Sequence, residues 1–103
     1  MEEVRVYIIA NLQIHDADRY REYEKGFFPI LKKYEGEFIT FDDNIVHMEG
    51  DKPMEGRVIL LSFPSAKHAD VWYSSDEYQA LSEHRRASVT TTLTRVSGMP
   101  LRK

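Results

Sequence analysis

Several features are missing from this chain of 103 residues, and each absence excludes a class of protein or site. It contains no cysteine, so we expect no disulfide, no thiolate metal site and no cysteine nucleophile. No apolar run approaches the roughly 20 residues of a membrane span, so we expect no membrane partner. The first residues, Met1 to Glu3, are acidic and lack the basic segment that opens a signal peptide. These absences predict a cytoplasmic protein.

The chain also lacks any concentration of basic residues. Its 14 lysines and arginines are scattered along the sequence, and 17 aspartates and glutamates outnumber them. Binding to a phosphate backbone needs a concentrated basic face, so nucleic acid is not an expected partner. The length predicts one domain over residues 1–103 with a core over about residues 4–97. A domain of this size has a thin stability margin, which pairing with a second copy would improve.

The first predicted element is a strand over residues 4–15, because apolar and mixed side chains alternate there. The apolar set is Val4, Val6, Ile8, Ala10, Leu12 and Ile14. The mixed set is Arg5, Tyr7, Ile9, Asn11, Gln13 and His15. The first set predicts a core-facing side, and the second set predicts a side turned away from the helices.

An amphipathic helix follows, because apolar residues recur every three or four positions from Tyr20 to Tyr34. Asp16 suits the N-cap position. Gly26 and Pro29 interrupt the pattern, so we expect a kink or a restart there. Gly36 is expected to end the helix in a left-handed conformation.

The middle of the chain predicts strands separated by polar turns. Residues 37–41 and 44–49 form a predicted hairpin, and residues 50–56 form a loop with two glycines. Residues 57–63 are nearly all apolar, which is typical of a central strand covered on both faces.

Two helices and a strand complete the chain. Ser65 caps a short predicted helix that ends near Tyr73. Ser74 and Glu77 have the spacing of a capping box for a second helix, which we expect to run to about Ala87. The threonines and aliphatic residues that follow predict a final strand.

This order of elements predicts an α+β fold. It is the ferredoxin-like βαββαβ pattern with an extra hairpin strand, in which helices cover one face of an antiparallel sheet. The other face would leave Tyr7, Ile9 and Phe63 bare. An apolar face of that size usually marks an interface, so we expect a homodimer.

A set of motifs also resembles a known family. These motifs are Asn11, the helix with Tyr20 and Tyr23, Glu49-Gly50-Asp51, Arg57, Phe63-Pro64-Ser65, Ala69, Trp72-Tyr73-x-Ser75-x-x-Tyr78 and Arg85. Over residues 4–97 the chain is similar to family 1330 of the domains of unknown function. The resemblance implies a dimeric α+β barrel, in which two ferredoxin-like sheets close on each other, and implies no particular activity. Two positions depart from the family pattern: Lys52 replaces a common aromatic residue, and Glu35-Gly36 replaces a Gly-Gly pair.

The wider superfamily that the resemblance implies includes cofactor-independent oxygenases, isomerases, haem-degrading oxygenases and ligand-binding domains. Haem degradation would require an asparagine on the first strand, a tryptophan after the third strand, and a histidine about ten residues later. Asn11 and Trp72 fit, but Ser82 occupies the third position. His84 lies about 200° around a helix from it. We therefore expect no haem, and no other cofactor.

The four histidines do not form a metal-binding pattern. They are His15, His47, His68 and His84, and no two of them have the spacing of ligands on one helix. His47 and Glu49 share one strand face, but a metal needs three or four converging ligands. We expect no metal site. A nucleotide site is also not expected, because the glycine-containing loop has no GxGxxG motif.

The candidate ligand-binding residues are Tyr7, Asn11, Trp72 and Arg85. Asn11 is polar among apolar neighbours, and a buried amide without partners costs about 1–3 kcal/mol, so backbone, water or a ligand must satisfy it. Arg85 either favours the end of its helix dipole or holds a ligand carboxylate with its planar fork. The two aromatic residues either pack the core and the dimer interface or hold an apolar ligand body. No catalytic residue is identified.

Two functions remain open at this point. The first is a homodimer that binds a small organic molecule in a pocket between sheet and helices, with cofactor-independent oxygenase or isomerase-type chemistry. The second is a non-catalytic ligand-binding or structural dimer module. A cavity with a titratable group between helices and sheet would favour the first.

Overall fold

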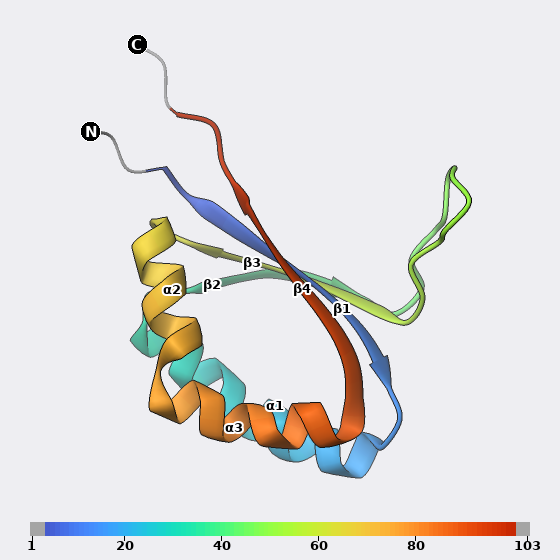
Figure 1. Cartoon of the computed structure of the whole chain (residues 1–103), viewed down its shortest axis with the longest axis horizontal. Helices are drawn as coiled ribbons and strands as arrows, with labels where there is room; N and C mark the ends of the chain where they lie inside the picture. Colours follow the sequence, from blue (N-terminus) through green and yellow to red (C-terminus); the bar gives the residue numbers. More distant parts are fainter. Residues whose placement is uncertain (1–3, 101–103) are drawn as a thin grey trace.

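The computed structural model describes residues 4–100, so the acidic first residues considered above lie outside it. The elements in chain order are β1 (Val6–Ile14), α1 (Ala17–Lys33), β2 (Glu37–Asp42), β3 (Arg57–Phe63), α2 (Ala66–Ser74), α3 (Asp76–Ser88) and β4 (Val89–Ser97). The helices lie together on one side of the sheet, and the long connection between β2 and β3 projects from the opposite side (Figure 1). This arrangement confirms the predicted ferredoxin-like βαββαβ fold with helices on one face.

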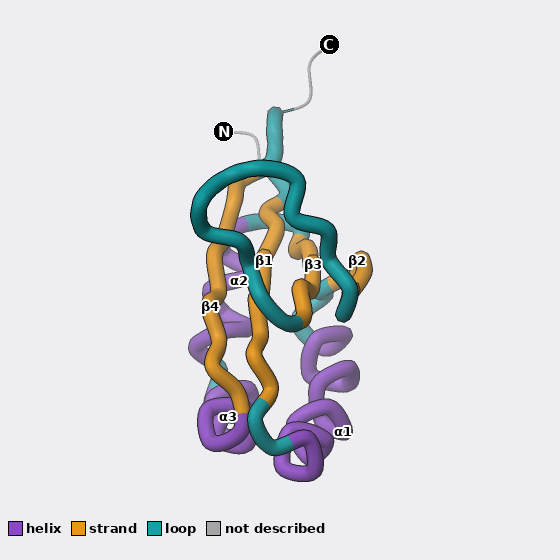
Figure 2. Tube along the Cα trace, turned by 90° about the vertical axis from the view of Figure 1, so that its right-hand side faces the viewer, coloured by secondary structure: helices purple, strands orange, loops and turns teal. Residues whose placement is uncertain are grey.

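The four strands form one antiparallel sheet in the order β2-β3-β1-β4, with the first strand of the chain at its centre (Figure 2). Val6 pairs with Phe63 on one side and with Ser97 on the other. Side chains alternate between the faces of a strand. The buried set of β1, which includes Ala10 and Leu12, therefore faces the helices, and the alternate set with Tyr7, Ile9 and Asn11 faces away.

Helix α1 begins where its sequence predicts. The Asp16 side chain accepts a hydrogen bond from the Arg19 backbone N–H at 3.1 Å. The helix then runs without interruption through Gly26 and Pro29, so the predicted restart does not occur. Pro29 lies on the exposed side of the helix, where the loss of one internal hydrogen bond leaves a carbonyl near solvent rather than in the core.

The end of α1 uses a different residue from the predicted one. Glu35, not Gly36, adopts the left-handed conformation, with φ of 64°. The Gly36 N–H donates to the Leu31 carbonyl at 2.8 Å and the Glu35 N–H to the Lys32 carbonyl at 3.0 Å, which is the pattern of a Schellman motif. Gly36 is needed for close packing instead, because a Cβ there would lie 2.7 Å from the Phe63 ring.

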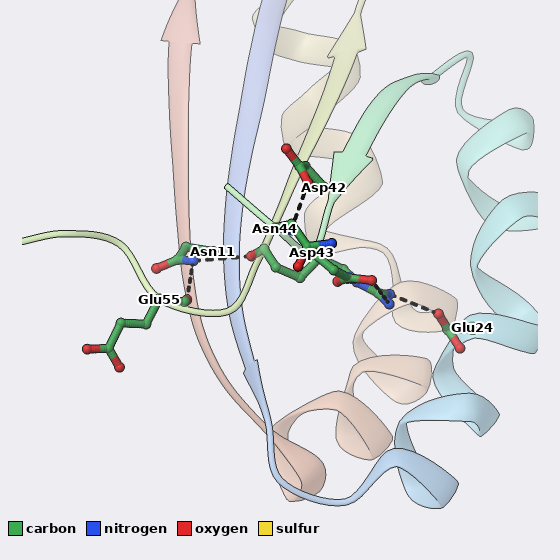
Figure 3. Close-up of polar contacts among 7 residues, drawn as sticks. Asn11, Glu24, Asp42, Asp43, Asn44 and Glu55 are labelled. Atoms are coloured by element: carbon green, nitrogen blue, oxygen red, sulfur yellow. Dashed lines mark hydrogen bonds and ion pairs between the residues drawn. The ribbon is translucent and has the colours of Figure 1, made fainter. Parts of the chain in front are cut away.

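The predicted second hairpin strand over residues 44–49 does not form. The Asp42 side chain accepts a hydrogen bond from the Asn44 N–H at 2.8 Å and turns the chain away from the sheet (Figure 3). Residues 43–56 then make an irregular projection, here called the arm, and β3 pairs directly with β2. Val46 and Met48 on the arm are 83% and 91% exposed, so within residues 4–100 these apolar side chains are not packed as those of a sheet strand would be.

The two later helices are capped by serines. Ser65 caps α2 as predicted, and its side chain accepts from the His68 N–H. The predicted capping box of Ser74 and Glu77 places the start of α3 one residue too early. Ser75 caps this helix, and its side chain accepts from the Tyr78 N–H at 3.2 Å. Ser74 instead donates to the Asp70 carbonyl, as a residue in the last turn of α2 can.

The core lies between the sheet and the helices. Phe63, predicted to be bare on the other face, is fully buried there, and its ring lies 5.0 Å from that of Trp72. Strand β3 is covered by helices on one face only within this chain, because Val58 and Leu60 lie on the helix-free side and are partly exposed. Within residues 4–100, no helix has the length and apolar character needed to cross a membrane.

Gly56 fixes the entry of the chain into β3. Its φ is +85°, and a Cβ at this position would overlap the Leu12 carbonyl oxygen of the neighbouring strand. Gly50 on the arm also has a positive φ of +113°, but a Cβ there would meet only the His47 side chain, at 3.7 Å. An alanine would therefore strain the backbone at either position, but only at Gly56 would its Cβ also collide with the backbone of the neighbouring strand.

We expect Gly50→Ala to lower the free energy of unfolding by about 1–2 kcal/mol, the cost of left-handed backbone. Gly56→Ala should lower it by about 3 kcal/mol or more, because the backbone of β1 cannot move aside as a side chain can. Urea unfolding of both variants at one protein concentration measures the difference. Equal losses would show that the contact with β1 does not constrain this position.

Candidate functional site

A cavity of about 200 Å³ lies between the sheet and the helices. Its floor consists of side chains from all four strands, with Ala10 and Leu12 of the central strand among them. Aromatic residues of α1 and β2 form much of the wall, and Trp72, Tyr78 and Arg85 close it from α2 and α3. The lining is therefore mainly apolar and aromatic, with a few polar groups, as is usual for small-molecule sites.

Two tyrosine hydroxyls meet inside the helix layer. The hydroxyl oxygens of Tyr23 on α1 and Tyr78 on α3 lie 2.7 Å apart and share a hydrogen bond. Burial, followed by the neighbouring Tyr78, raises the pKa of the Tyr23 phenol well above its ordinary value. At neutral pH this hydroxyl is therefore protonated and acts as a hydrogen-bonding group, not as a phenolate base.

Trp72 forms the wall beside this pair. Its side chain is 1% exposed, and its ring centroid lies 4.2 Å from that of Tyr78. The indole Nε1 is buried and has no hydrogen-bond partner among the described residues. The ring also borders a second cavity between α2 and β4, where Arg95 pairs with Asp70 at 2.6 Å. Trp72 therefore separates two interior spaces.

Arg85 brings a positive charge to the first cavity. The residue is 5% exposed, and its guanidinium carbon lies 5.8 Å from the centre of the Tyr23 ring, within range of a cation–π contact. Its Nε is buried without a hydrogen-bond partner in the described part of the chain. Among residues 4–100 no carboxylate lies within ion-pair distance of it.

A second arginine lines the cavity at its rim. Arg57, the first residue of β3, binds Asp43 at 2.6 Å and Glu24 at 3.2 Å, so it joins the start of the arm to α1 (Figure 3). Its guanidinium also lies 5.0 Å from the centre of the Phe41 ring. Burial, and then the Glu24 carboxylate, raises the pKa of the nearby Tyr20 to about 12.

The four predicted ligand-binding residues divide between the two faces of the sheet. Trp72 and Arg85 line the cavity. Tyr7 and Asn11 lie on the helix-free face, because they alternate with the buried residues of β1. Within residues 4–100, neither of the two cavities has all four in its lining.

Backbone groups satisfy the Asn11 amide. Its Nδ2 donates to the Glu55 carbonyl at 2.8 Å and to the Arg57 carbonyl at 3.1 Å, on either side of Gly56 (Figure 3). Its Oδ1 accepts from Gln13 at 3.2 Å. Asn11 therefore holds the end of the arm against β1, and backbone carbonyls are the partners of its amide nitrogen.

Sequence reasoning missed Arg57 and the tyrosine pair. A signal for Arg57 exists: it lies two, four and six residues before Ile59, Leu61 and Phe63, and so on their face of β3. Treating β3 as covered on both faces hid this distinction. Tyr23 and Tyr78 are 55 residues apart, and no local pattern predicts that their hydroxyls meet.

The histidines have local partners. The His68 ring lies 2.7 Å from the Ser65 hydroxyl, and His84 accepts a hydrogen bond from Arg19. In the part of the chain that the structure describes, no three His, Asp or Glu side chains converge as metal ligands would.

Comparisons with known proteins place this geometry in a family context. A crystal structure of a protein of unknown function from Rhodopseudomonas palustris is similar, with a TM-score of 0.79 and 14% identity over 97% of this chain and 86% of the other. The cofactor-independent oxygenase SnoaB from Streptomyces nogalater aligns with a TM-score of 0.59 and 13% identity over 95% and 96% of the two chains. A NIPSNAP family protein of unknown function from Agrobacterium tumefaciens aligns with a TM-score of 0.58 and 11% identity over 95% and 91%.

At these identities the solved structures establish a shared fold and nothing more specific. No curated protein matches the sequence at a significant level. The model of one family matches residues 5–99, which is nearly the whole chain. Its fold is similar to that of the oxygenase and of the NIPSNAP family protein. The chain belongs to the family described as domain of unknown function (DUF1330).

Proposed function

We propose that this protein binds a small organic molecule with an apolar, ring-containing body in the cavity between the sheet and the helices. The cavity itself is the observation that supports this function. It remains open in the core of a chain of only 103 residues, although large aromatic side chains surround it. An unfilled apolar space lowers stability, because its lining atoms lose contacts that close packing would give them.

The cavity is also suited to chemistry on a bound ligand. Its donors, the guanidinium of Arg85 and the neutral hydroxyl of Tyr23, stabilise negative charge rather than remove protons. Such donors would stabilise an oxyanion that develops on a bound ligand during cofactor-independent oxygenase or isomerase-type chemistry. We therefore retain this chemistry as part of the proposal, with a non-catalytic ligand-binding module as the alternative.

We further propose that two copies associate through the helix-free face of the sheet. This face presents Tyr7, Ile9, Val58, Leu60 and Val96, of which Tyr7 and Val96 are 37% and 44% exposed. The arm projects on the same side and carries the exposed Val46, Met48 and Met54 (Figure 1). Apolar surface on both features supports a partner that packs on the sheet and contacts the arm.

The binding proposal is tested with neutral aromatic compounds, from toluene to naphthalene. Trp72 is the only tryptophan, so a change in its fluorescence reports binding beside it. At tenfold excess over the dissociation constant we expect a rise in Tm of about 5–10 °C, because ligand stabilises only the folded state.

A cavity-filling substitution supplies the control for this test. Ala10 lines the first cavity but not the second, which Trp72 also borders. Ala10→Leu should abolish the response, and Ala87→Leu on the exposed side of α3 should preserve it. If the Ala10→Leu variant still responds to the compounds, they bind outside the proposed cavity.

The dimer proposal predicts a light-scattering mass of twice the chain mass at micromolar concentration. The interface should bury more than about 1,000 Å² in total, the usual scale of stable interfaces. Thr94→Lys, on the helix-free face opposite Ile9, should shift the mass toward the monomer, because it places a charge in the interface. Val71→Lys on exposed α2 is the matched control and should remain dimeric. A monomeric wild type would refute the proposal.

A further inference from the structure

The charge of Arg85 is not neutralised by the protein around it. A guanidinium does not lose its proton in proteins, so burial cannot remove the charge as it can for lysine. Isolated buried charges are costly, and they are normally paired or well hydrogen-bonded. Here the Nε has no partner, and a contact with the face of the Tyr23 ring is the main compensation described.

The acidic group nearest this space does not balance it. Glu24 also lines the cavity, but it lies at the rim, where Arg57 binds it at 3.2 Å. Asp43 binds the same arginine. At the rim, two carboxylates pair with the guanidinium of Arg57. In the described interior, the guanidinium of Arg85 has no carboxylate partner.

A second unpartnered donor lies on the same wall. The Trp72 Nε1 is buried without an acceptor, and Trp72 and Arg85 both line the cavity. Buried donors of this kind almost always have an acceptor in native structures. The two residues that carry these unpartnered donors therefore line the same apolar space, and the terminal nitrogens of the Arg85 guanidinium are the groups that an acceptor in this space would meet.

We propose that the ligand of this cavity is an organic anion, a carboxylate or an enolate with an apolar ring-containing body, whose charged head binds Arg85. This inference rests on the proposed binding function and specifies its chemical class. The guanidinium fork offers paired N–H donors to a planar oxyanion, and a hydrogen bond to a charged group is about twice as strong as a neutral one. The aromatic walls hold the body.

The test compares two compounds that differ in charge and hardly in shape, hydrocinnamate and hydrocinnamamide. Binding is followed by Trp72 fluorescence and by calorimetry on the full chain. We expect the acid to bind about 10- to 100-fold more tightly than the amide, the factor that one charge-assisted hydrogen bond supplies. The preference should disappear when the acid is protonated at low pH.

Arg85→Met and Arg85→Gln remove the charge, the first with similar length and the second with retained hydrogen bonding. Both should bind acid and amide equally. Arg86→Met is the matched control, because Arg86 is the exposed neighbour that binds Gln79, and its preference for the acid should be unchanged. If both Arg85 variants fail to fold, the wild-type comparison of acid and amide still decides.

The outcomes separate the two proposals. Equal binding of acid and amide to the wild type would overturn the anionic class and leave the cavity function standing. Failure of these compounds and of the neutral aromatics would overturn both. An acid preference that survives in both Arg85 variants would reject Arg85 as the binding group. Displacement of hydrocinnamate by acetate or phosphate at equal concentration would show a site for any small anion and contradict the requirement for an apolar body.

Discussion

Pairing of β1 along both of its edges is the constraint on which the rest of the molecule depends. Its register with β3 and β4 fixes which side chains face the helices, because neighbouring residues of a strand point to opposite faces. Ala10 and Leu12 thereby become the floor of the cavity, and Tyr7 and Asn11 become part of the bare face. A slip of one residue would exchange the two sets and place the Asn11 amide in the aromatic interior.

The two arginines of the cavity show how position decides the cost of a charge. Arg57 lies at the rim, where two carboxylates and solvent are near, and its ion pairs with them raise its pKa further. Arg85 lies between α3 and the sheet with an aromatic ring as its described neighbour. In a medium of low effective dielectric constant the interaction of such a charge with an anion is much stronger than in water. The same geometry that makes the buried charge costly would therefore strengthen the proposed binding of a negatively charged molecule.

The sequence predicts the features that periodicity encodes and fails where partners are distant. Alternation in residues 4–15 and the helical period from Tyr20 to Tyr34 were sufficient for the sheet, α1 and the fold class. Residues 44–49 also carry apolar side chains, but Val46 and Met48 are exposed in the described structure, and this cannot be read locally. For the candidate site, Trp72 and Arg85 lie at the cavity, and their binding of a ligand stays a prediction. The alternation of β1 places Tyr7 and Asn11 on the other face of the sheet. That Arg85 has no carboxylate partner among the described residues could not be predicted from the sequence, because it depends on every element packed around this side chain.

The pairing of β1 with β4 also sets the order in which the protein can form on the ribosome. Val6 and Ser97 are opposite each other in the sheet, so β1 finds its β4 partner only after all the residues between them have emerged. Until then β1 has one unpaired edge and the cavity lacks one side of its floor. Contacts so distant in sequence form slowly, because the loop between them must close first. The nascent chain thus exposes apolar strands throughout its synthesis, and loss of the final strand would remove a neighbour of β1 and not merely a tail.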